Sequence, residues 1–155
     1  MNKKALVLIL LYVVVMFLTV LTSILSIWEY YKLIGKPFFE VQWNYQVYAL
    51  LFVLQLWLFI FIGILTLRLF LKVYKNFEFI DKHYYSIVGV ALALFIYGIL
   101  PNFISVITIS GKYVEVLNSH QMTNKLVLVM GSAMFVLSVI YEKSQKIKKE
   151  NELTI

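Results

Sequence analysis

The stretch YQVYALLFVLQLWLFIFIGILTLRLFL, residues 45–71, contains a single charged side chain, Arg68, close to its end. A helix rises about 1.5 Å per residue, and about 20 apolar residues cross a hydrocarbon core of about 30 Å. The stretch is therefore long enough to span a membrane with some tilt. It predicts a transmembrane helix, and the rest of the chain decides how many such helices there are.

Three further apolar runs flank this stretch. The first, 5–28, follows Lys3 and Lys4 and is too long for a secretory signal, so we expect an uncleaved helix; a retained signal anchor gives the same membrane assignment. The run 126–141 is short and is expected to recruit preceding polar residues or to tilt. The sequence predicts an all-α protein, a single transmembrane domain over residues 1–155 folded as an up-and-down four-helix bundle. Its expected parts are helices at about 5–28, 45–71, 84–110 and 124–141, and a helical tail at 142–155.

The composition excludes an ordinary soluble domain. Hydrophobic residues make up 62% of the chain, charged residues 14%, and the mean hydropathy is +0.86. The net charge of +6 comes from basic residues between the apolar runs, which favours a role in topology over nucleic-acid binding. Cysteine is absent, so disulfides, thiol catalysis and thiolate metal sites are excluded.

The basic residues also predict the orientation. With the N-terminus inside, ten Lys and Arg residues fall on the inner side and four on the outer side. The outer four are Lys32, Lys36, Lys112 and Lys125. Tyr and Trp gather at the expected boundaries, for example Trp28, Tyr30 and Trp43 outside. Both patterns predict a multi-pass protein of a cell membrane with both termini in the cytoplasm.

Two polar features interrupt the expected spans. Gln55 lies in the middle of the second helix and should face the interior, level with Tyr97 of the third, to which it could hydrogen-bond. We interpret Gln55 as a packing contact rather than a substrate or ion contact. Asn102 follows Pro101 in the third helix, where a static kink is favoured over the broken-helix site of a transporter. Together Gln55, Tyr97 and Asn102 define the alternative function, a small transporter or channel subunit with a polar midplane site.

Signatures of catalysis are missing from the sequence. It contains no G-x-S-x-G, no H-E-x-x-H and no glycine-rich phosphate loop, and its acidic residues all lie outside the apolar runs. His83 and His120 fall on opposite sides of the predicted membrane and cannot share a metal. We therefore expect no enzyme activity, no cofactor and no metal site, and leave a homo-oligomer open.

Two segments on the predicted inner side stand out as interaction surfaces. The connection LKVYKNFEFIDKH, 71–83, interleaves lysines with aromatic residues, as segments lying on anionic lipid do. The tail EKSQKIKKENELTI, 142–155, pairs Glu and Lys at i,i+4, which favours a helix that continues into the cytoplasm. A solvated topology anchor remains the simpler interpretation of the tail.

The last six residues also carry a resemblance. Glu150, Asn151, Glu152, Leu153, Thr154 and Ile155, supported by Phe77, Asp81 and Gly89, resemble the bacterial four-helix membrane family called domain of unknown function 2975. The chain departs from that family at Glu78, Phe79, Tyr84 and Tyr85, where a Ser or Thr and basic residues are usual. Members commonly accompany small helix-turn-helix regulators. The resemblance therefore implies a membrane partner of a cytoplasmic regulator, with Phe77, Asp81 and residues 150–155 as the docking surface.

Overall fold

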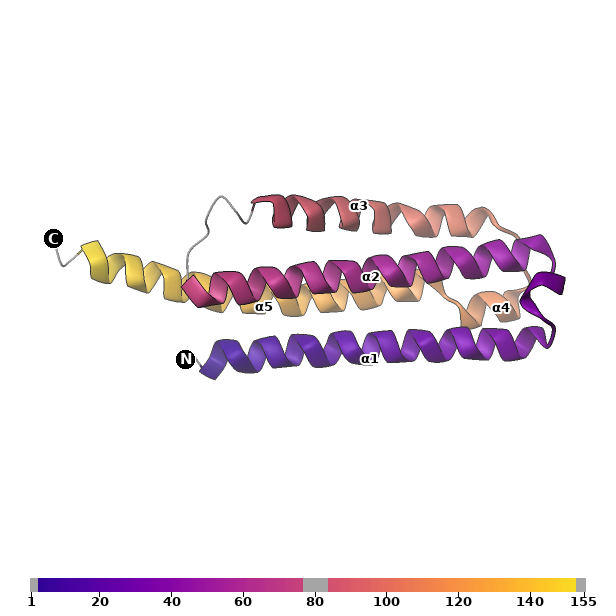
Figure 1. The fold of residues 1–155 in the computed structure, drawn as a ribbon, viewed down its shortest axis with the longest axis horizontal. Coiled ribbons are helices and arrows are strands. Elements are labelled where there is room, and N and C mark those ends of the chain that lie inside the picture. The colour runs from indigo at the N-terminus through magenta and orange to yellow at the C-terminus, as the bar shows by residue number, and fades with distance from the viewer. Residues whose placement is uncertain (1–2, 77–83, 153–155) are drawn as a thin grey trace.

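The computed structural model describes residues 3–76 and 84–152. Four long helices lie side by side along one axis, which confirms the predicted all-α fold (Figure 1). The elements are α1 (Lys3–Ile34), the 3-10 helix η1 (Phe38–Glu40), α2 (Trp43–Asn76), α3 (Tyr84–Val106), α4 (Gly111–Val116) and α5 (Ser119–Glu152). We call the end of the bundle that carries η1 and α4 the α4 end. The opposite end, where α1 begins and α5 ends, is the terminal end.

The turn between α1 and α2 depends on a glycine. Gly35 has φ of +63°, in the left-handed region that side chains with a Cβ rarely adopt, and its N–H donates to the Tyr31 carbonyl at 3.4 Å. This bond satisfies a free carbonyl at the end of α1 while the chain reverses direction. Because the reversal is short, α1 and α2 pack as antiparallel neighbours.

The core lies along seams of regular spacing. Helix α2 contacts α1, α3 and α5, and α5 also contacts α1. The buried side chains of α2 recur at alternating intervals of four and three residues, and so do those of α5. The stripe of α2 comprises Tyr48, Phe52, Gln55, Phe59, Ile62, Thr66 and Leu69, with Leu56 and Phe70 buried beside it, and that of α5 comprises Ser119, Met122, Leu126, Val129, Ala133, Val136 and Ile140. Such spacing keeps one narrow stripe of each helix against its neighbours, as in coiled coils.

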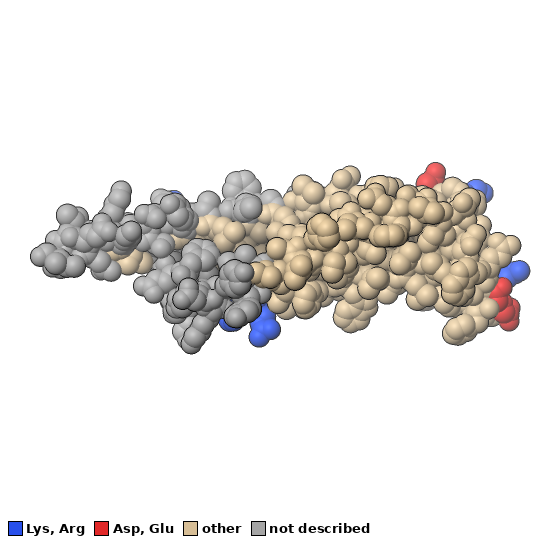
Figure 2. Space-filling model, turned by 90° about the horizontal axis from the view of Figure 1, so that it is seen from above, with Lys and Arg blue, Asp and Glu red and all other residues tan. Residues whose placement is uncertain are grey.

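Three helices have the length and composition of membrane spans. They are Leu6–Ile34, Trp43–Lys72 and Val88–Val106. Large apolar side chains such as Leu10, Phe17, Trp57 and Phe95 are exposed on the outside of the bundle. In Figure 2 a broad uncharged surface extends from the charged residues at the α4 end toward the terminal end. An apolar surface of this extent requires lipid around it, so the chain is a multi-pass membrane protein.

The helix bounds differ from the expected ones, with α1, α2 and α5 longer than predicted and α3 shorter. Helices α1 and α2 extend past 5–28 and 45–71, because polar residues at a membrane surface continue a helix at little cost. Helix α3 continues through Pro101 and ends at Val106, not at 110, where the Ile107 N–H donates to the Ile104 carbonyl at 3.1 Å in a tighter final turn. Helix α5 begins at Ser119, before the expected residue 124, because the Asn118 side chain accepts the Gln121 N–H at 2.9 Å and caps it. The short helix α4 was not expected.

Candidate functional site: a polar layer inside the bundle

Gln55 is the centre of a polar layer between α2 and α5. Its side chain is fully buried, so the expectation that it faces the interior is confirmed. Its Oε1 accepts a hydrogen bond from the Ser119 hydroxyl at 2.7 Å. Its Nε2 donates to the Ser119 carbonyl at 3.1 Å and to the Thr123 hydroxyl at 3.4 Å. The amide therefore joins α2 to the first turn of α5 from both of its ends.

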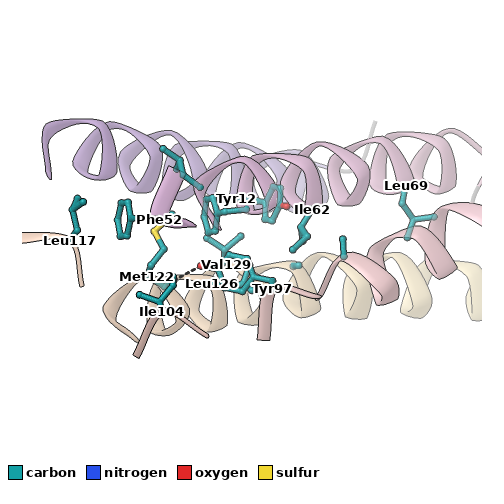
Figure 3. Close-up of a cluster of buried hydrophobic side chains, with 14 of the residues drawn as sticks. Tyr12, Phe52, Ile62, Leu69, Tyr97, Ile104, Leu117, Met122, Leu126 and Val129 are labelled. Carbon is teal, nitrogen blue, oxygen red and sulfur yellow. Dashed lines mark hydrogen bonds between the residues drawn. The ribbon is translucent and has the colours of Figure 1, made fainter. Parts of the chain in front are cut away.

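Tyr97 joins α3 to the same turn of α5. Its ring is fully buried, and its hydroxyl donates to the Met122 carbonyl at 2.9 Å (Figure 3). Tyr97 also lies within side-chain interaction range of Gln55, but the proton of its hydroxyl points to α5. Asn102 is exposed, so the structure brings together Gln55 and Tyr97 of the predicted midplane site without Asn102.

Helix α1 completes the layer with small polar residues. Thr19 and Ser23 are buried, and both hydroxyls donate to carbonyls one turn earlier in α1. The Ser23 hydroxyl also lies 3.2 Å from the Met122 sulfur. Small residues of this kind let two helices approach closely inside a membrane. They explain why α1, whose spanning segment is only 17% buried, still packs along α5.

The layer lies deep in the bundle. Two hydrogen bonds set the antiparallel register of α1 and α2: the Tyr12 hydroxyl donates to the Gly63 carbonyl at 3.1 Å, and the Tyr30 hydroxyl to the Tyr45 carbonyl at 2.9 Å. Gln55 lies about 18 Å along α2 from Trp43, at 1.5 Å per residue. Helix α5 therefore starts well inside the bundle rather than at its end, and the chain between α3 and α5 descends to reach it.

The descending chain is held by tyrosines. The Tyr48 hydroxyl donates to the Leu117 carbonyl at 2.8 Å, and the Leu117 side chain is fully buried. Tyr113 of α4 makes edge-on ring contacts with Tyr30 and Tyr45, at centroid distances of 5.7 and 4.8 Å. Tyr30 is thus buried among these rings inside the bundle. A buried phenol needs a partner for its hydroxyl, and the Tyr45 carbonyl supplies it.

Lys125 is the residue of this region that sequence reasoning misplaced. It lies within α5, and its ammonium donates to the Thr22 hydroxyl of α1 at 3.0 Å. Thr22 is about 18 Å from Ile34 along α1. Lys125 therefore lies within a helix of the bundle and not in a connection, and without it the predicted orientation count is ten against three. A cation at this depth is costly, and such residues usually have a function.

The helix-capping pattern of Asn118 followed by Ser119 was the signal that could have revealed the early start of α5.

A small cavity opens beside the polar layer at the α4 end. Its volume is about 200 Å³, and its lining includes Tyr48, Pro101, Ser105, Ser119 and His120. Among the described residues, no buried side-chain nitrogen or oxygen lacks a hydrogen-bond partner. The described part of the chain also contains no cluster of His, Asp and Glu able to hold a metal ion. The polar groups of the layer therefore bond to one another and hold the four helices together.

The predicted docking residues are distributed differently. Phe77 and Asp81, and likewise Leu153, Thr154 and Ile155, lie outside the described residues. Asn151 and Glu152 belong to the last turn of α5, and Glu150 is exposed on it. Helix α5 is continuous to Glu152 and extends past the ends of α1 and α2 at the terminal end (Figure 1).

Comparison with protein-family models, with curated proteins and with solved structures finds no match to this chain. The resemblance of residues 150–155 to domain of unknown function 2975 therefore stays a prediction. The fold and the apolar surface define the class of the molecule, a helical multi-pass membrane protein.

Proposed function

We propose that this chain crosses a bacterial cell membrane four times, with both termini in the cytoplasm, and acts without enzymatic chemistry as the membrane anchor of a soluble protein. The fourth crossing is supported by α5, whose apolar run 126–141 lies beside α1 and α2. A helix packed alongside spanning helices over that length passes through the same lipid. The cytoplasmic assignment rests on the excess of Lys and Arg at the terminal end.

The observation that carries the proposed docking role is the continuation of α5 beyond the bundle (Figure 1). Short isolated helices are marginal in water, but a helix already nucleated within the bundle adds turns at low cost. The projecting part carries the exposed apolar residue Ile147 beside the exposed Glu150. A helix with apolar anchors and flanking charges suits a groove on a partner protein. The family resemblance suggests a small helix-turn-helix regulator as that partner.

Labelling of single cysteines tests the topology, because the chain contains no cysteine of its own. Phe39→Cys lies at the α4 end, where Phe39 is 89% exposed, and Glu150→Cys lies on the projecting end of α5. In intact cells a membrane-impermeant maleimide should label position 39 and not position 150. Permeabilised cells should label both. Labelling of both positions in intact cells, or of position 150 alone, contradicts the proposed topology.

Site-specific photocrosslinking tests the docking. A photoreactive residue at Ile147 should crosslink in living cells to one soluble protein, identified by mass spectrometry. The same residue at Phe39 is the control and should not capture that protein. Ending the chain after Lys149 should abolish the crosslink at 147, since residues 150–155 are removed. Capture that persists in the shortened chain would show that residues 150–155 do not dock the partner.

The alternative, a small transporter or channel subunit, has one observation in its favour. The 200 Å³ cavity includes Ser119 in its lining, and Ser119 is the hydrogen-bond partner of Gln55. Transport would require these two side chains to exchange their mutual bonds for bonds to a solute. Gln55→Leu combined with Asn102→Leu should then abolish activity, and removal of residues 150–155 should not. The docking proposal predicts the reverse.

A further inference from the structure

The ammonium group of Lys125 lies at a depth where lipid hydrocarbon surrounds the bundle. Its hydrogen-bond partner Thr22 belongs to the candidate span Leu6–Ile34, which has 29 residues. A hydrocarbon core takes up about 20 residues of a helix, and every stretch of that length within this span includes Thr22. The exposed Trp28 ring, over which the Lys32 ammonium lies at 5.4 Å, is about 9 Å nearer the α4 end of α1. Tryptophan and lysine of this kind mark the headgroup level, so the Lys125 ammonium lies below it.

The positive charge of Lys125 is not neutralised within the described residues. An ammonium has three N–H donors, and one of them bonds to the Thr22 hydroxyl at 3.0 Å. That hydroxyl is neutral, and it donates its own proton to the Thr19 carbonyl at 3.0 Å. No carboxylate of the described chain pairs with Lys125; the nearest acidic residue of α1, Glu29, lies about 10 Å along the helix from Thr22. Two N–H groups and the charge are thus left for a group outside this chain.

Further polar side chains adjoin Lys125 on the outside of the bundle. Gln121, Asn124 and Lys125 stand at i, i+3 and i+4 of α5, so they share one side of the helix, and both amides are exposed. On α1 the Ser26 hydroxyl donates to the Thr22 carbonyl at 3.1 Å, one turn toward the α4 end. Exposed amides and hydroxyls at such depths favour association with another helix over contact with lipid. We call Thr22, Gln121, Asn124 and Lys125 the polar face.

We propose that the polar face binds the spanning helix of another membrane protein, which carries an aspartate or glutamate at the level of Lys125. The carboxylate accepts the two remaining N–H groups of the ammonium, and the two charges neutralise each other in the lipid. The partner is a membrane protein, so this site is separate from the proposed docking of a soluble protein at the terminal end, and either can fail alone.

Charge and depth select this occupant over two others. A second copy of the chain in the same orientation carries its acidic residues at the same depths, outside the apolar runs, so it brings no carboxylate to Lys125. A phospholipid phosphate lies at the headgroup level, above the hydrocarbon core that contains the ammonium. A carboxylate within a spanning helix is the anion that reaches this level.

Association with model helices in phosphatidylcholine vesicles at neutral pH tests the proposal. The probes are synthetic spanning helices of leucine and alanine with one Asp, Asn or Leu at the depth of Lys125, each labelled with a fluorescent acceptor. The full chain carries the donor on Phe39→Cys, since Phe39 is 89% exposed at the α4 end. We expect the Asp helix to bind about tenfold more tightly than the Leu helix, with the Asn helix between them. Equal binding of the Asp and Leu helices would overturn the proposal.

Two substitutions at position 125 separate charge pairing from packing. Lys125→Met should lower the binding of the Asp helix to that of the Leu helix, whereas the matched control Arg68→Met, which removes an exposed cation of α2, should leave it unchanged. Lys125→Asp should reject the Asp helix and bind a model helix that carries Lys, with folding of each variant checked by circular dichroism. Equal losses in Lys125→Met and Arg68→Met, or no binding of the Lys helix by folded Lys125→Asp, would contradict the proposed pair.

Photocrosslinking in native membranes identifies the partner. Val127 is 66% exposed and stands at i+3 from Asn124, so a photoreactive residue there flanks the polar face. It should capture a membrane protein with Asp or Glu in a spanning segment, and capture should disappear in Lys125→Met and persist in Arg68→Met. Crosslinks only to lipid, to a second copy of the chain, or to a protein without an acidic residue in its spans would each refute the assignment.

Discussion

The half of the bundle at the α4 end and the half at the terminal end are held together in different ways. In the first, side-chain hydrogen bonds link helices at several levels, through Gln55 to Ser119, Tyr97 to Met122, Tyr48 to Leu117 and Tyr30 to Tyr45. In the second, packing dominates among the described residues, with Ile62, Leu69, Phe70, Val136 and Ile140 all buried. Tyr12 adds a hydrogen bond to Gly63 there and an edge-on contact with Phe70 at 5.4 Å.

This difference has a physical reason. The terminal half contains continuous helices whose backbone groups bond within each helix, so close packing is sufficient to hold them. The α4 half contains the end of α3, the helix α4 and the start of α5, which leave backbone groups without partners inside the helices. Two of those groups are satisfied by side chains: the Tyr48 hydroxyl donates to the Leu117 carbonyl at the end of α4, and the Asn118 side chain accepts the Gln121 N–H at the start of α5. The polar side chains are therefore found where the helices are interrupted.

Among the variants that test this difference between the halves, Gln55→Leu should cause the largest loss in the free energy of unfolding. It leaves the buried Ser119 hydroxyl without its acceptor, while the Ser119 carbonyl keeps the hydrogen bond from the Thr123 hydroxyl, and we expect the free energy of unfolding to fall by about 2 kcal/mol. The control is Asn102→Leu, since Asn102 is exposed and contributes nothing to the layer. Reversible unfolding in mixed micelles measures both variants. If both variants lost the same unfolding free energy, the polar layer would not be a special source of stability.

Tyr48→Phe should have the next largest effect. It removes only the hydroxyl that donates to Leu117, and we expect a loss of about 1 kcal/mol in unfolding free energy. Tyr12→Phe makes the same chemical change in the terminal half, where the carbonyl of Gly63 already bonds within α2, and should lose about half as much. The same unfolding assay compares them. If Tyr12→Phe lost more unfolding free energy than Tyr48→Phe, side-chain hydrogen bonds would matter more in the terminal half than in the α4 half.

Lys125→Met should change stability in the opposite direction. It removes a cation from a membrane depth where charge is costly and keeps the length of the side chain, so we expect a gain of about 1 kcal/mol. Thr22→Val removes the hydroxyl partner and leaves the ammonium in place, so it should destabilise. A stabilised Lys125→Met protein that no longer functions in cells would mark Lys125 as a functional residue. A loss of stability would instead show that the pair with Thr22 holds α1 to α5.

Gly63→Ala should have the smallest effect. A Cβ at position 63 would collide with the tip of the Met16 side chain, but that tip is flexible and can move, so we expect a loss of about 0.5 kcal/mol or less. Gly98→Ala is the control, because nothing lies within 4 Å of a Cβ there. It should gain up to about 1 kcal/mol from helix propensity. A large loss at Gly63 would mean that the packing of α1 on α2 is more rigid than the contact with Met16 implies.

The sequence identified Gln55 and Tyr97 but not their partners. Both were recognisable because a polar or amphipathic residue in the middle of an apolar run must face the interior of a bundle. Asn102, selected because it follows Pro101 in the third helix, lies on the exposed side. Ser119 was assigned to the connection before residue 124 and Lys125 was counted on the outer side, since polarity alone does not reveal that a segment passes between helices.

By itself, the sequence determined that this protein is a helical membrane protein and roughly where its long helices run, because the cost of placing polar groups in lipid applies to each segment separately. Only the tertiary structure decided the depth at which α5 begins, the burial of Tyr30, the partners of Gln55 and the position of Lys125. Each of these depends on groups far apart in the chain meeting at one level. Hydropathy describes the surroundings of a helix, whereas hydrogen bonding between helices decides how they are assembled.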